Sequence, residues 1–157
     1  MIEQGGVTVA PLSSDAAEID TIARWRYDAF LQSYGLTLDD SRAQLLRLVD
    51  PPPGEAALVA RRDGKPAGVC MLVRDELDAP HDLSPWLASL FVIPPLRSKG
   101  IGRKLVAAIE GAARAHGYKA VHLYTDSAES LYRICGWSVT ERFSWDGVPA
   151  VLMSKAL

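Results

Sequence analysis

The chain has 157 residues, of which 48% are hydrophobic and 23% charged, and its formal net charge at pH 7 is -2. This length predicts a single domain over residues 1–157, and the composition excludes disordered, collagen-like and coiled-coil proteins. Because the net charge is small and negative, the protein as a whole has no electrostatic field that would attract nucleic acid or anionic membranes. No apolar run approaches the ~20 residues of a membrane span, and two cysteines are too few for a disulfide framework or a zinc cluster. We therefore expect a cytoplasmic protein without a bound metal, nucleic acid or membrane.

The first half of the chain is predicted to combine strands with two helices. Asp15 with Glu18 three residues later is typical of a helix start, and the helical apolar spacing continues to Phe30. Three prolines between Asp50 and Gly54 end a second helix. The expected elements, in chain order, are strand 7–11, helix 15–30, helix 40–49 and a hairpin of strands 56–61 and 66–73.

The second half is predicted to contain the central strand of the sheet. Residues 86–93 form an almost continuous apolar run, which is typical of a strand covered on both faces. The elements expected after it are helix 102–116, strand 119–125, helix 126–135 and strands 138–143 and 148–154. This order predicts a mixed α/β sheet.

The junction between the central strand and the next helix has the features of an anion site. It reads Arg-Ser-Lys-Gly-Ile-Gly-Arg over residues 97–103, and from Arg97 to Ile109 there are four cations and no carboxylate. Unpaired N–H groups at a helix start attract phosphate, and Gly100 and Gly102 let a ligand approach the backbone. A solvated basic turn is the alternative. The pattern is not a Rossmann fingerprint, because Leu105 stands where the third glycine would be, and no Walker motif is present.

From Trp86 to Trp137 the chain resembles the GNAT superfamily of N-acetyltransferases. Arg-x-x-Gly-x-Gly follows a buried strand that ends Val-x-Pro, and Ala128-x-x-x-Tyr132-x-x-x-Gly136-Trp137 is similar to the second family motif, with Trp in place of Phe. The resemblance implies a GNAT-like α/β fold: a mixed, mostly antiparallel sheet with splayed central parallel strands and about four helices. It also implies acetyl-coenzyme A as the co-substrate.

The resemblance places the coenzyme A site on the splayed strand and the loop after it. Backbone groups of the strand would bind the pantetheine arm, and main-chain N–H groups of the loop would wrap the pyrophosphate. Thr125 stands where many relatives carry an Asn that helps to hold coenzyme A. The implied binding residues are Leu90, Phe91, Val92, Arg97, Ser98, Lys99, Gly100, Ile101, Gly102, Arg103 and Thr125.

Tyr132 is the candidate catalytic residue. A phenol of pKa ~10 beside the thioester can donate a proton to the departing coenzyme A thiolate. The alternative is a half-buried Tyr on an amphipathic helix. Cys135 lies at a helix end without a motif histidine, so we interpret it as a packing residue and not as a nucleophile.

The proton acceptor and the amine acceptor are left open by the sequence. The strand before the loop contains no carboxylate, and the candidate bases just upstream are Asp78, His81 and Asp82. Four carboxylates in this segment predict attraction of a cationic amine, with a solvated loop as the alternative: Asp75, Glu76, Asp78 and Asp82. Four aromatic residues could line the acceptor pocket, although such residues are more often core: Trp25, Tyr27, Tyr34 and Trp145.

The predicted function is transfer of acetyl from acetyl-coenzyme A to a primary amine of a small molecule or peptide, by direct attack in a ternary complex. A non-catalytic acyl-coenzyme A sensor of the same fold is the alternative, and a Rossmann-like nucleotide enzyme is a third interpretation. The terminal hairpin offers an edge for a homodimer.

Overall fold

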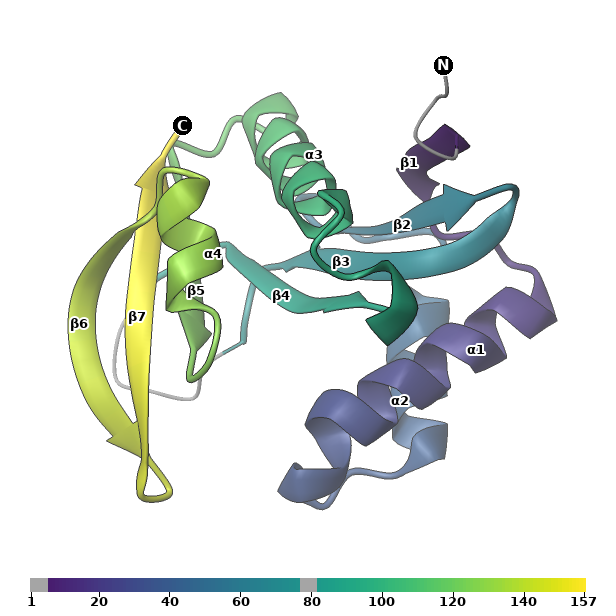
Figure 1. Ribbon diagram of the computed structural model, residues 1–157, viewed down its shortest axis with the longest axis horizontal. Coiled ribbons are helices and arrows are strands. Elements are labelled where there is room, and N and C mark those ends of the chain that lie inside the picture. Colours follow the sequence, from purple (N-terminus) through teal and green to yellow (C-terminus); the bar gives the residue numbers. More distant parts are fainter. Residues whose placement is uncertain (1–5, 77–81) are drawn as a thin grey trace.

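The computed structural model describes residues 6–76 and 82–157 (Figure 1). The elements of the first half are β1 (Val7–Pro11), α1 (Ala16–Arg26), α2 (Leu38–Arg47), β2 (Ala56–Arg62), β3 (Lys65–Val73) and β4 (Trp86–Val92). Those of the second half are α3 (Ile101–Ala115), β5 (Ala120–Thr125), α4 (Glu129–Ile134), β6 (Ser138–Trp145) and β7 (Val148–Ala156). Apart from the end of α1, these bounds lie within three residues of those expected from the sequence.

The helix starts follow from local capping. The Asp15 carboxylate accepts the Glu18 N–H at 3.1 Å and begins α1. Thr37 and Asp40 form a reciprocal capping box, so α2 begins two residues before the predicted start at position 40. The helix predicted to reach Phe30 ends as an α-helix at Arg26 and continues as a π-helical turn, Tyr27–Leu31. The apolar spacing therefore predicted correctly that the helical segment continues past Arg26. The backbone hydrogen bonds, however, change there from the α-helical to the π-helical pattern.

The seven strands of the described chain form one sheet in the order β1-β2-β3-β4-β5-β7-β6. β4 is the central strand, as predicted. Its pairing with β5 is parallel, and every other neighbouring pair is antiparallel. The mixed, mostly antiparallel fold class is confirmed.

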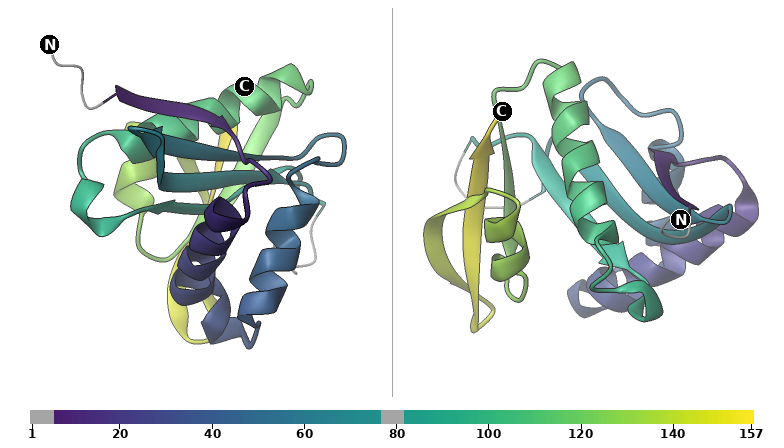
Figure 2. Two further views of the ribbon diagram at one scale, coloured as in Figure 1. Left: turned by 90° about the vertical axis from the view of Figure 1, so that its right-hand side faces the viewer. Right: turned by 45° about the horizontal axis from the view of Figure 1, so that its top comes forward.

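Helices cover both faces of the sheet. Figure 2 shows α3 on one face of β1–β4 and the α1–α2 pair on the other. The α3 face buries a core that includes Leu105, Ile109 and Leu123. The opposite face, here called the α1–α2 face, buries a second core that includes Ile22 and Leu45. A ligand that passes through the sheet would connect these two faces.

Within residues 6–76 and 82–157, no helix has both the length and the apolar character needed to cross a membrane. The same residues contain no group of three or more His, Cys, Asp or Glu side chains arranged to hold a metal ion.

Candidate active site

β4 and β5 separate after a single point of pairing. Trp86 pairs with His122, whose N–H donates to the Pro85 carbonyl at 3.1 Å. Beyond Trp86, no described residue of β4 pairs with β5, although β4 stays paired with β3. The predicted coenzyme A residues Leu90–Val92 are therefore half-buried, and the backbone groups on their β5 side are left for another partner. The splayed central strands are confirmed, and the opening between them is called the splay below.

A bulge in β4 lies beside the splay. Ser89 has a positive φ of 56°, and the register against β3 shifts between Val69 and Met71. Ala88 packs in the α1–α2 core, whereas Leu90 packs against the α3 core. The extra residue thus lets β4 bend away from β5 while both faces stay covered.

The predicted phosphate loop leads from β4 into α3. Gly100 adopts φ 89° and precedes the first turn, in which the Lys104 N–H donates to the Gly100 carbonyl at 3.1 Å. The N–H groups of residues 101–103 lie before that first helical bond, and no described protein group accepts from them. A Cβ added at Gly102 would come no closer than 3.9 Å to another residue, so the helix start is open to a ligand. This geometry suits an anion.

Ser98 takes the left-handed conformation within the same loop, with φ 62°. That region favours glycine and costs other residues about 1 to 2 kcal/mol. Ser98, Lys99 and Arg103 are all solvent-exposed, so their groups can reach a ligand at the helix start.

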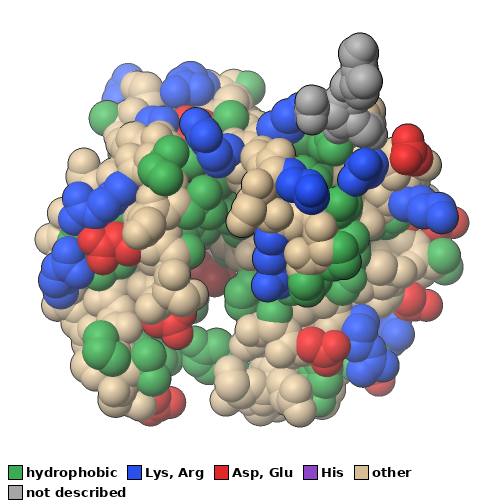
Figure 3. Space-filling view, in the orientation of Figure 1, with side chains coloured by type: hydrophobic (Ala, Val, Ile, Leu, Met, Phe, Trp, Pro, Cys, Tyr) green, Lys and Arg blue, Asp and Glu red, His purple; other side chains and the backbone are tan. Residues whose placement is uncertain are grey.

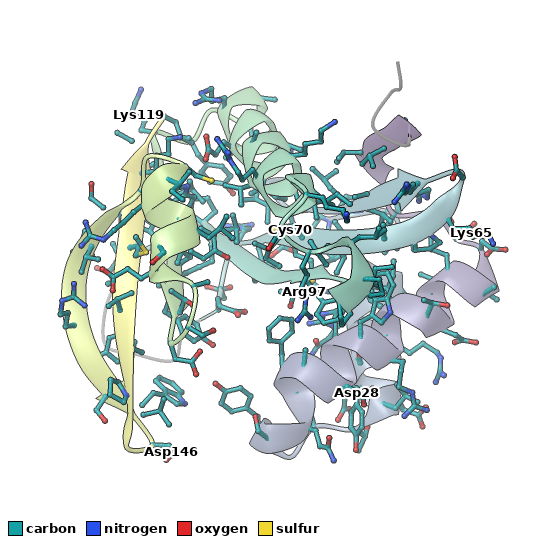
Figure 4. All side chains as sticks on the ribbon, viewed as in Figure 1. Asp28, Lys65, Cys70, Arg97, Lys119 and Asp146 are labelled. Carbon is teal, nitrogen blue, oxygen red and sulfur yellow. The ribbon has the colours of Figure 1, made fainter. Side chains whose placement is uncertain are left out.

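Arg97 holds the loop against the end of β4. Its Nε donates to the Val92 carbonyl at 2.8 Å, and its guanidinium lies 5.2 Å from the centre of the Phe91 ring. Figure 4 shows the labelled Arg97 beside β4. Arg97 therefore already fixes the loop through one donor, and its remaining N–H groups are available for the pyrophosphate.

Tyr132 projects from α4 toward the opposite half of the molecule. It is 5% exposed, packs in the α3 core, and its ring centre lies 5.9 Å from that of Trp137. Burial raises the pKa of its phenol above the ordinary value, and the thiols of Cys70 and Cys135 add to this effect. Cys70 belongs to β3, and its Sγ lies 3.8 Å from the Ala88 carbonyl of β4. Leu90 and Val92 of β4 pack against the same core as Tyr132, so the phenol is buried on the α3 side of the splayed strand.

The Tyr132 hydroxyl makes no hydrogen bond with any described residue of the chain. Buried tyrosine hydroxyls normally have a partner. A protonated phenol without one, beside a gap between strands, is suited to donate a hydrogen bond to a ligand in that gap.

The Thr125 hydroxyl has a structural task. Its Oγ1 accepts the N–H groups of Ser127 and Ala128 at 3.2 and 3.0 Å, so it shapes the turn between β5 and α4. The hydroxyl proton is still available for donation, because both of these bonds use the oxygen as acceptor.

The α1–α2 face of the splay contains a buried cation that the sequence analysis missed. Arg26 is 4% exposed, and its guanidinium donates to the Oγ of Ser89 and Ser41 at 3.2 and 3.4 Å and to Gln44 Oε1 at 2.9 Å. Burial lowers the pKa of Arg26 to about 10, so it stays charged at neutral pH. The sequence did not indicate this site, because Arg26 lies on a helix predicted from its apolar spacing and its partners are distant in sequence.

Glu76 and Tyr124 lie on the same face. Burial raises the pKa of Glu76, opposed by the positive charge of Arg26. Burial also raises the pKa of Tyr124, and Glu76, Tyr34 and Asp126 add to it. The negative charge of Glu76 thus affects both Arg26 and Tyr124. Of the other candidate bases and carboxylates, Asp78 and His81 lie outside the described residues, and Asp75 and Asp82 are exposed.

Aromatic side chains line this face, as the sequence analysis expected in part. The Tyr124 ring stacks on Trp145 with centres 6.1 Å apart, and Tyr34 approaches the Tyr124 phenol. Trp25 packs on Phe91 of β4, with ring centres 5.4 Å apart. Three of the four predicted aromatic residues thus pack against or beside the splayed strands, and Tyr27 begins the π-helical turn after α1.

Figure 3 shows a hollow between the half that contains α1 and α2 and the half that contains β6 and β7. An acidic side chain is visible deep in the hollow, and Lys and Arg side chains border it. The hollow thus has side chains of both charge signs in it and around it.

A family comparison agrees with this geometry. The model of the acetyltransferase (GNAT) family matches residues 19–137, which include β4, the phosphate loop and Tyr132. The chain belongs to the GNAT acetyltransferase family. It is accordingly an acyltransferase by family.

Individual relatives show the same fold. The chain is 35% identical over 91 residues to N-alpha-acetyltransferase 80 of Mus musculus, which covers 58% of this chain and about a quarter (26%) of that protein's length. A ribosomal-protein-alanine N-acetyltransferase from Brucella melitensis has a TM-score of 0.75 at 21% identity, covering 96% of this chain and 99% of that one. An aminoglycoside 6'-N-acetyltransferase complexed with coenzyme A has a TM-score of 0.73 at 16% identity, covering 95% and 96%.

Proposed function

We propose that this GNAT domain transfers acetyl from acetyl-coenzyme A to a primary amine by direct attack in a ternary complex. The observation that carries the proposal is the buried hydroxyl of Tyr132, which has no hydrogen-bond partner among the described residues. The N–H groups at the start of α3 would hold the pyrophosphate, and the free backbone of β4 would hold the pantetheine arm. These groups fit coenzyme A, whose anionic and amide parts need donors at the two positions.

Acetyl-coenzyme A and the amine would bind on opposite faces of the sheet. The loop and Tyr132 lie on the α3 face, so acetyl-coenzyme A would enter there and its thioester would reach the splay. Arg26, Tyr124 and the aromatic residues lie on the α1–α2 face, so the amine would approach from that side. Donor and acceptor can then be bound together, which lowers the entropic cost of their encounter.

The bond changes need no protein nucleophile. The lone pair of the neutral amine forms a bond to the thioester carbon, the carbon–sulfur bond breaks, and Tyr132 donates a proton to the departing sulfur. The products are an N-acetyl amide and coenzyme A. Burial, and then Glu110, raises the pKa of Cys135, which disfavours its thiolate and supports its role as a packing residue.

Acetyl-coenzyme A turnover with a panel of amines tests this proposal. The panel is a polyamine, an aminoglycoside, free amino acids and peptides with different N-terminal residues. We expect wild type to release coenzyme A with at least one amine and Tyr132→Phe to lower kcat on the order of 100-fold, with coenzyme A affinity little changed. Tyr118→Phe is the control, because it removes a hydroxyl that bonds the Gly54 carbonyl away from the splay.

The other interpretations predict different results. Tight coenzyme A binding without turnover on any amine would favour the acyl-coenzyme A sensor. Nucleotide binding that coenzyme A cannot displace would favour a Rossmann-like enzyme. Equal kcat for wild type and Tyr132→Phe would remove the proposed proton donor.

The cellular setting remains a prediction. We propose cytoplasmic action, supported by two cysteines that form no disulfide. A homodimer through the terminal hairpin is supported by the edge position of β6, which leaves one side of that strand available for pairing.

A further inference from the structure

The bulge in β4 changes the face to which the side chains of the strand point. Ser89 and Leu90 of β4 lie opposite the single residue Cys70 of β3, so β4 has one extra residue there. Ala88 packs in the α1–α2 core, whereas Leu90, two positions later, packs against the α3 core. In a regular strand these two residues would share a face. The extra residue therefore decides which groups lie on each side of β4 beyond the bulge.

The backbone groups of β4 change direction at the same place. Just before β4, the Pro85 carbonyl accepts an N–H of β5 at 3.1 Å, and just after it, the Ile93 N–H donates to a carbonyl of β3 at 3.0 Å. Because the hydrogen-bonding direction alternates along a strand, Leu90 and Val92 direct their backbone groups to the side of the splay. Without the extra residue, the alternation that starts at Pro85 would direct the same groups to β3.

Arg26 of α1 binds the bulge residue Ser89. Its Nε donates to Ser89 Oγ at 3.2 Å, and its terminal nitrogens donate to Ser41 Oγ of α2 at 3.4 Å and to Gln44 Oε1 of α2 at 2.9 Å. Ser41 is fully buried, and its own hydroxyl donates to the Ala23 carbonyl of α1 at 2.9 Å. One guanidinium thus joins α1, α2 and the bulge.

Packing alone does not explain a charge at position 26. Arg26 is 4% exposed, and within residues 6–76 and 82–157 every atom that accepts a hydrogen bond from its guanidinium is neutral. Burial of a charge costs free energy, so an apolar side chain of similar volume would stabilise the core at least as well. A planar guanidinium, however, has donors in fixed directions and can hold three elements in one arrangement.

We propose that Arg26 is a positioning residue, which holds Ser89 in the left-handed conformation of the bulge and so keeps the backbone of Leu90 and Val92 directed into the splay. The inference rests on the acetyl transfer proposed above, in which that backbone holds acetyl-coenzyme A. The φ of 56° is unfavourable for serine, and the hydrogen bond from a charged donor offsets part of this cost.

The alternative role of Arg26 is to attach α1 to α2. In that role the conformation of Ser89 would not matter. Arg42 provides a matched control, because it joins α2 to α1 through Asp20 at 2.8 Å and its other bonded partner is Asp39 of α2. Arg42→Gln therefore loosens the same helix pair without changing a bond to β4.

The first experiment compares Ser89→Ala with Ser89→Gly, by calorimetry with acetyl-coenzyme A and by kcat on the best amine from the panel. Both variants lose the Oγ that Arg26 binds, but only glycine adopts a positive φ without strain. Ser89→Ala should weaken binding and lower kcat on the order of ten-fold, and Ser89→Gly should lose clearly less in both. Equal losses in the two variants, or a wild-type result for Ser89→Ala, would overturn the inference. A wild-type protein that neither binds nor turns over acetyl-coenzyme A would instead contradict the proposed function.

The second experiment substitutes Arg26 in two backgrounds. Arg26→Gln should weaken acetyl-coenzyme A binding on the order of ten-fold in wild type and by a smaller factor in Ser89→Gly, because glycine does not need the guanidinium to keep its φ. Arg42→Gln should leave binding unchanged in both backgrounds. The same factor for Arg26→Gln in the two backgrounds, or an equal effect of Arg42→Gln, would overturn the inference.

A third measurement needs no ligand, and the Ser89 variants keep it decisive even if Arg26→Gln does not fold. The amide NMR resonances of Leu90 and Val92 report the direction of the β4 backbone beyond the bulge. Both resonances should move more in Ser89→Ala and Arg26→Gln than in Ser89→Gly and Arg42→Gln. Wild-type resonance positions in Ser89→Ala would overturn the inference and leave the acetyl transfer intact.

Discussion

The two halves of the sheet are built differently. β1–β4 form an uninterrupted antiparallel sheet that α3 covers on one face and the α1–α2 pair on the other. β5–β7 with α4 form a smaller unit, which joins β4 only at the Trp86–His122 pair among the described strand residues. Each half can be firmly packed because the opening lies between them. The proposed chemistry thus lies at the seam, where backbone groups of β4 have no strand partner on the β5 side.

Carboxylates with cationic partners occur in each half of the sheet and at the connection between the halves. In the first half, Glu18 is 8% exposed and binds Arg61 at 2.6 Å. In the second half, Glu129 is 31% exposed and binds Arg142 at 3.1 Å and Arg133 at 2.8 Å. A third carboxylate, Glu110 of α3, reaches across the division to Trp137 and Lys155. Substitutions at these three sites allow the contribution of each half, and of their connection, to the free energy of unfolding to be measured separately.

The largest effect is expected at the connection between the halves. Glu110 Oε2 accepts the Trp137 indole N–H at 3.0 Å, and Oε1 accepts the Lys155 ammonium at 2.8 Å. Glu110→Ala would leave the buried indole N–H and the ammonium without this partner, so we expect a loss of about 3 kcal/mol in the free energy of unfolding. Urea denaturation at pH 7 measures it.

Glu110→Gln is the matched control. Its amide oxygen can still accept from the indole, so the loss should be about 1 to 2 kcal/mol. Equal losses for Ala and Gln would show that the indole bond contributes nothing. A loss below 1 kcal/mol for Ala would show that Glu110 does not connect the halves.

A smaller effect is expected at Glu18, and the smallest at Glu129. Burial alone would raise the pKa of Glu18, but hydrogen bonds from Arg61 and Ser13 lower it overall. Hydrogen bonds from Arg142 and Arg133 lower the pKa of the more exposed Glu129 to about 2. Glu18→Gln should cost about 2 kcal/mol at pH 7, whereas solvent screening should leave Glu129→Gln close to wild type.

The pH dependence gives the sign of both effects. Each carboxylate has a lowered pKa in the folded state, so its stabilisation is complete above the unfolded value of 4.5. It is lost as the pH falls through the folded pKa, which for Glu129 is about 2, so the loss at Glu129 extends from pH 4.5 down to about pH 2. Urea denaturation at pH 7 and pH 3.5 should show a smaller acid-dependent loss in Glu18→Gln than in wild type. A larger stability loss in Glu129→Gln than in Glu18→Gln at pH 7 would contradict the predicted order.

Features with a local cause were predictable from the sequence. The Asp15 cap, the two hairpins and the glycine-containing helix start depend on residues a few positions apart. The start of α2 was missed by two residues because Asp40, and not Glu or Gln, completes its capping box. The left-handed φ of Ser98 was not anticipated, since sequence spacing carries no dihedral angle.

Features with a long-range cause were not predictable. Arg26 is 63 residues from Ser89, so its burial against the β4 bulge depends on how α1 docks on the sheet. Glu76 appeared in the sequence only as one of four nearby carboxylates. Its electrostatic effect on Arg26 and Tyr124 depends on the course of the chain after β3. The same holds for the Tyr132 hydroxyl, since only a structure can show that no residue of 6–76 or 82–157 bonds it.

The central claim is that the start of α3 binds the pyrophosphate of acetyl-coenzyme A and directs its thioester into the splay. Gly102 is the place to test it, because a Cβ there would make only ordinary van der Waals contacts, at 3.9 Å, and Asp is favourable in the first turn of a helix. Calorimetry with acetyl-coenzyme A should compare Gly102→Asp with its neutral isostere Gly102→Asn. We predict that both variants fold as stably as wild type and that Asp weakens binding at least ten-fold more than Asn. Equal affinities for Asp and Asn, or a wild-type protein that does not bind coenzyme A, would contradict the claim.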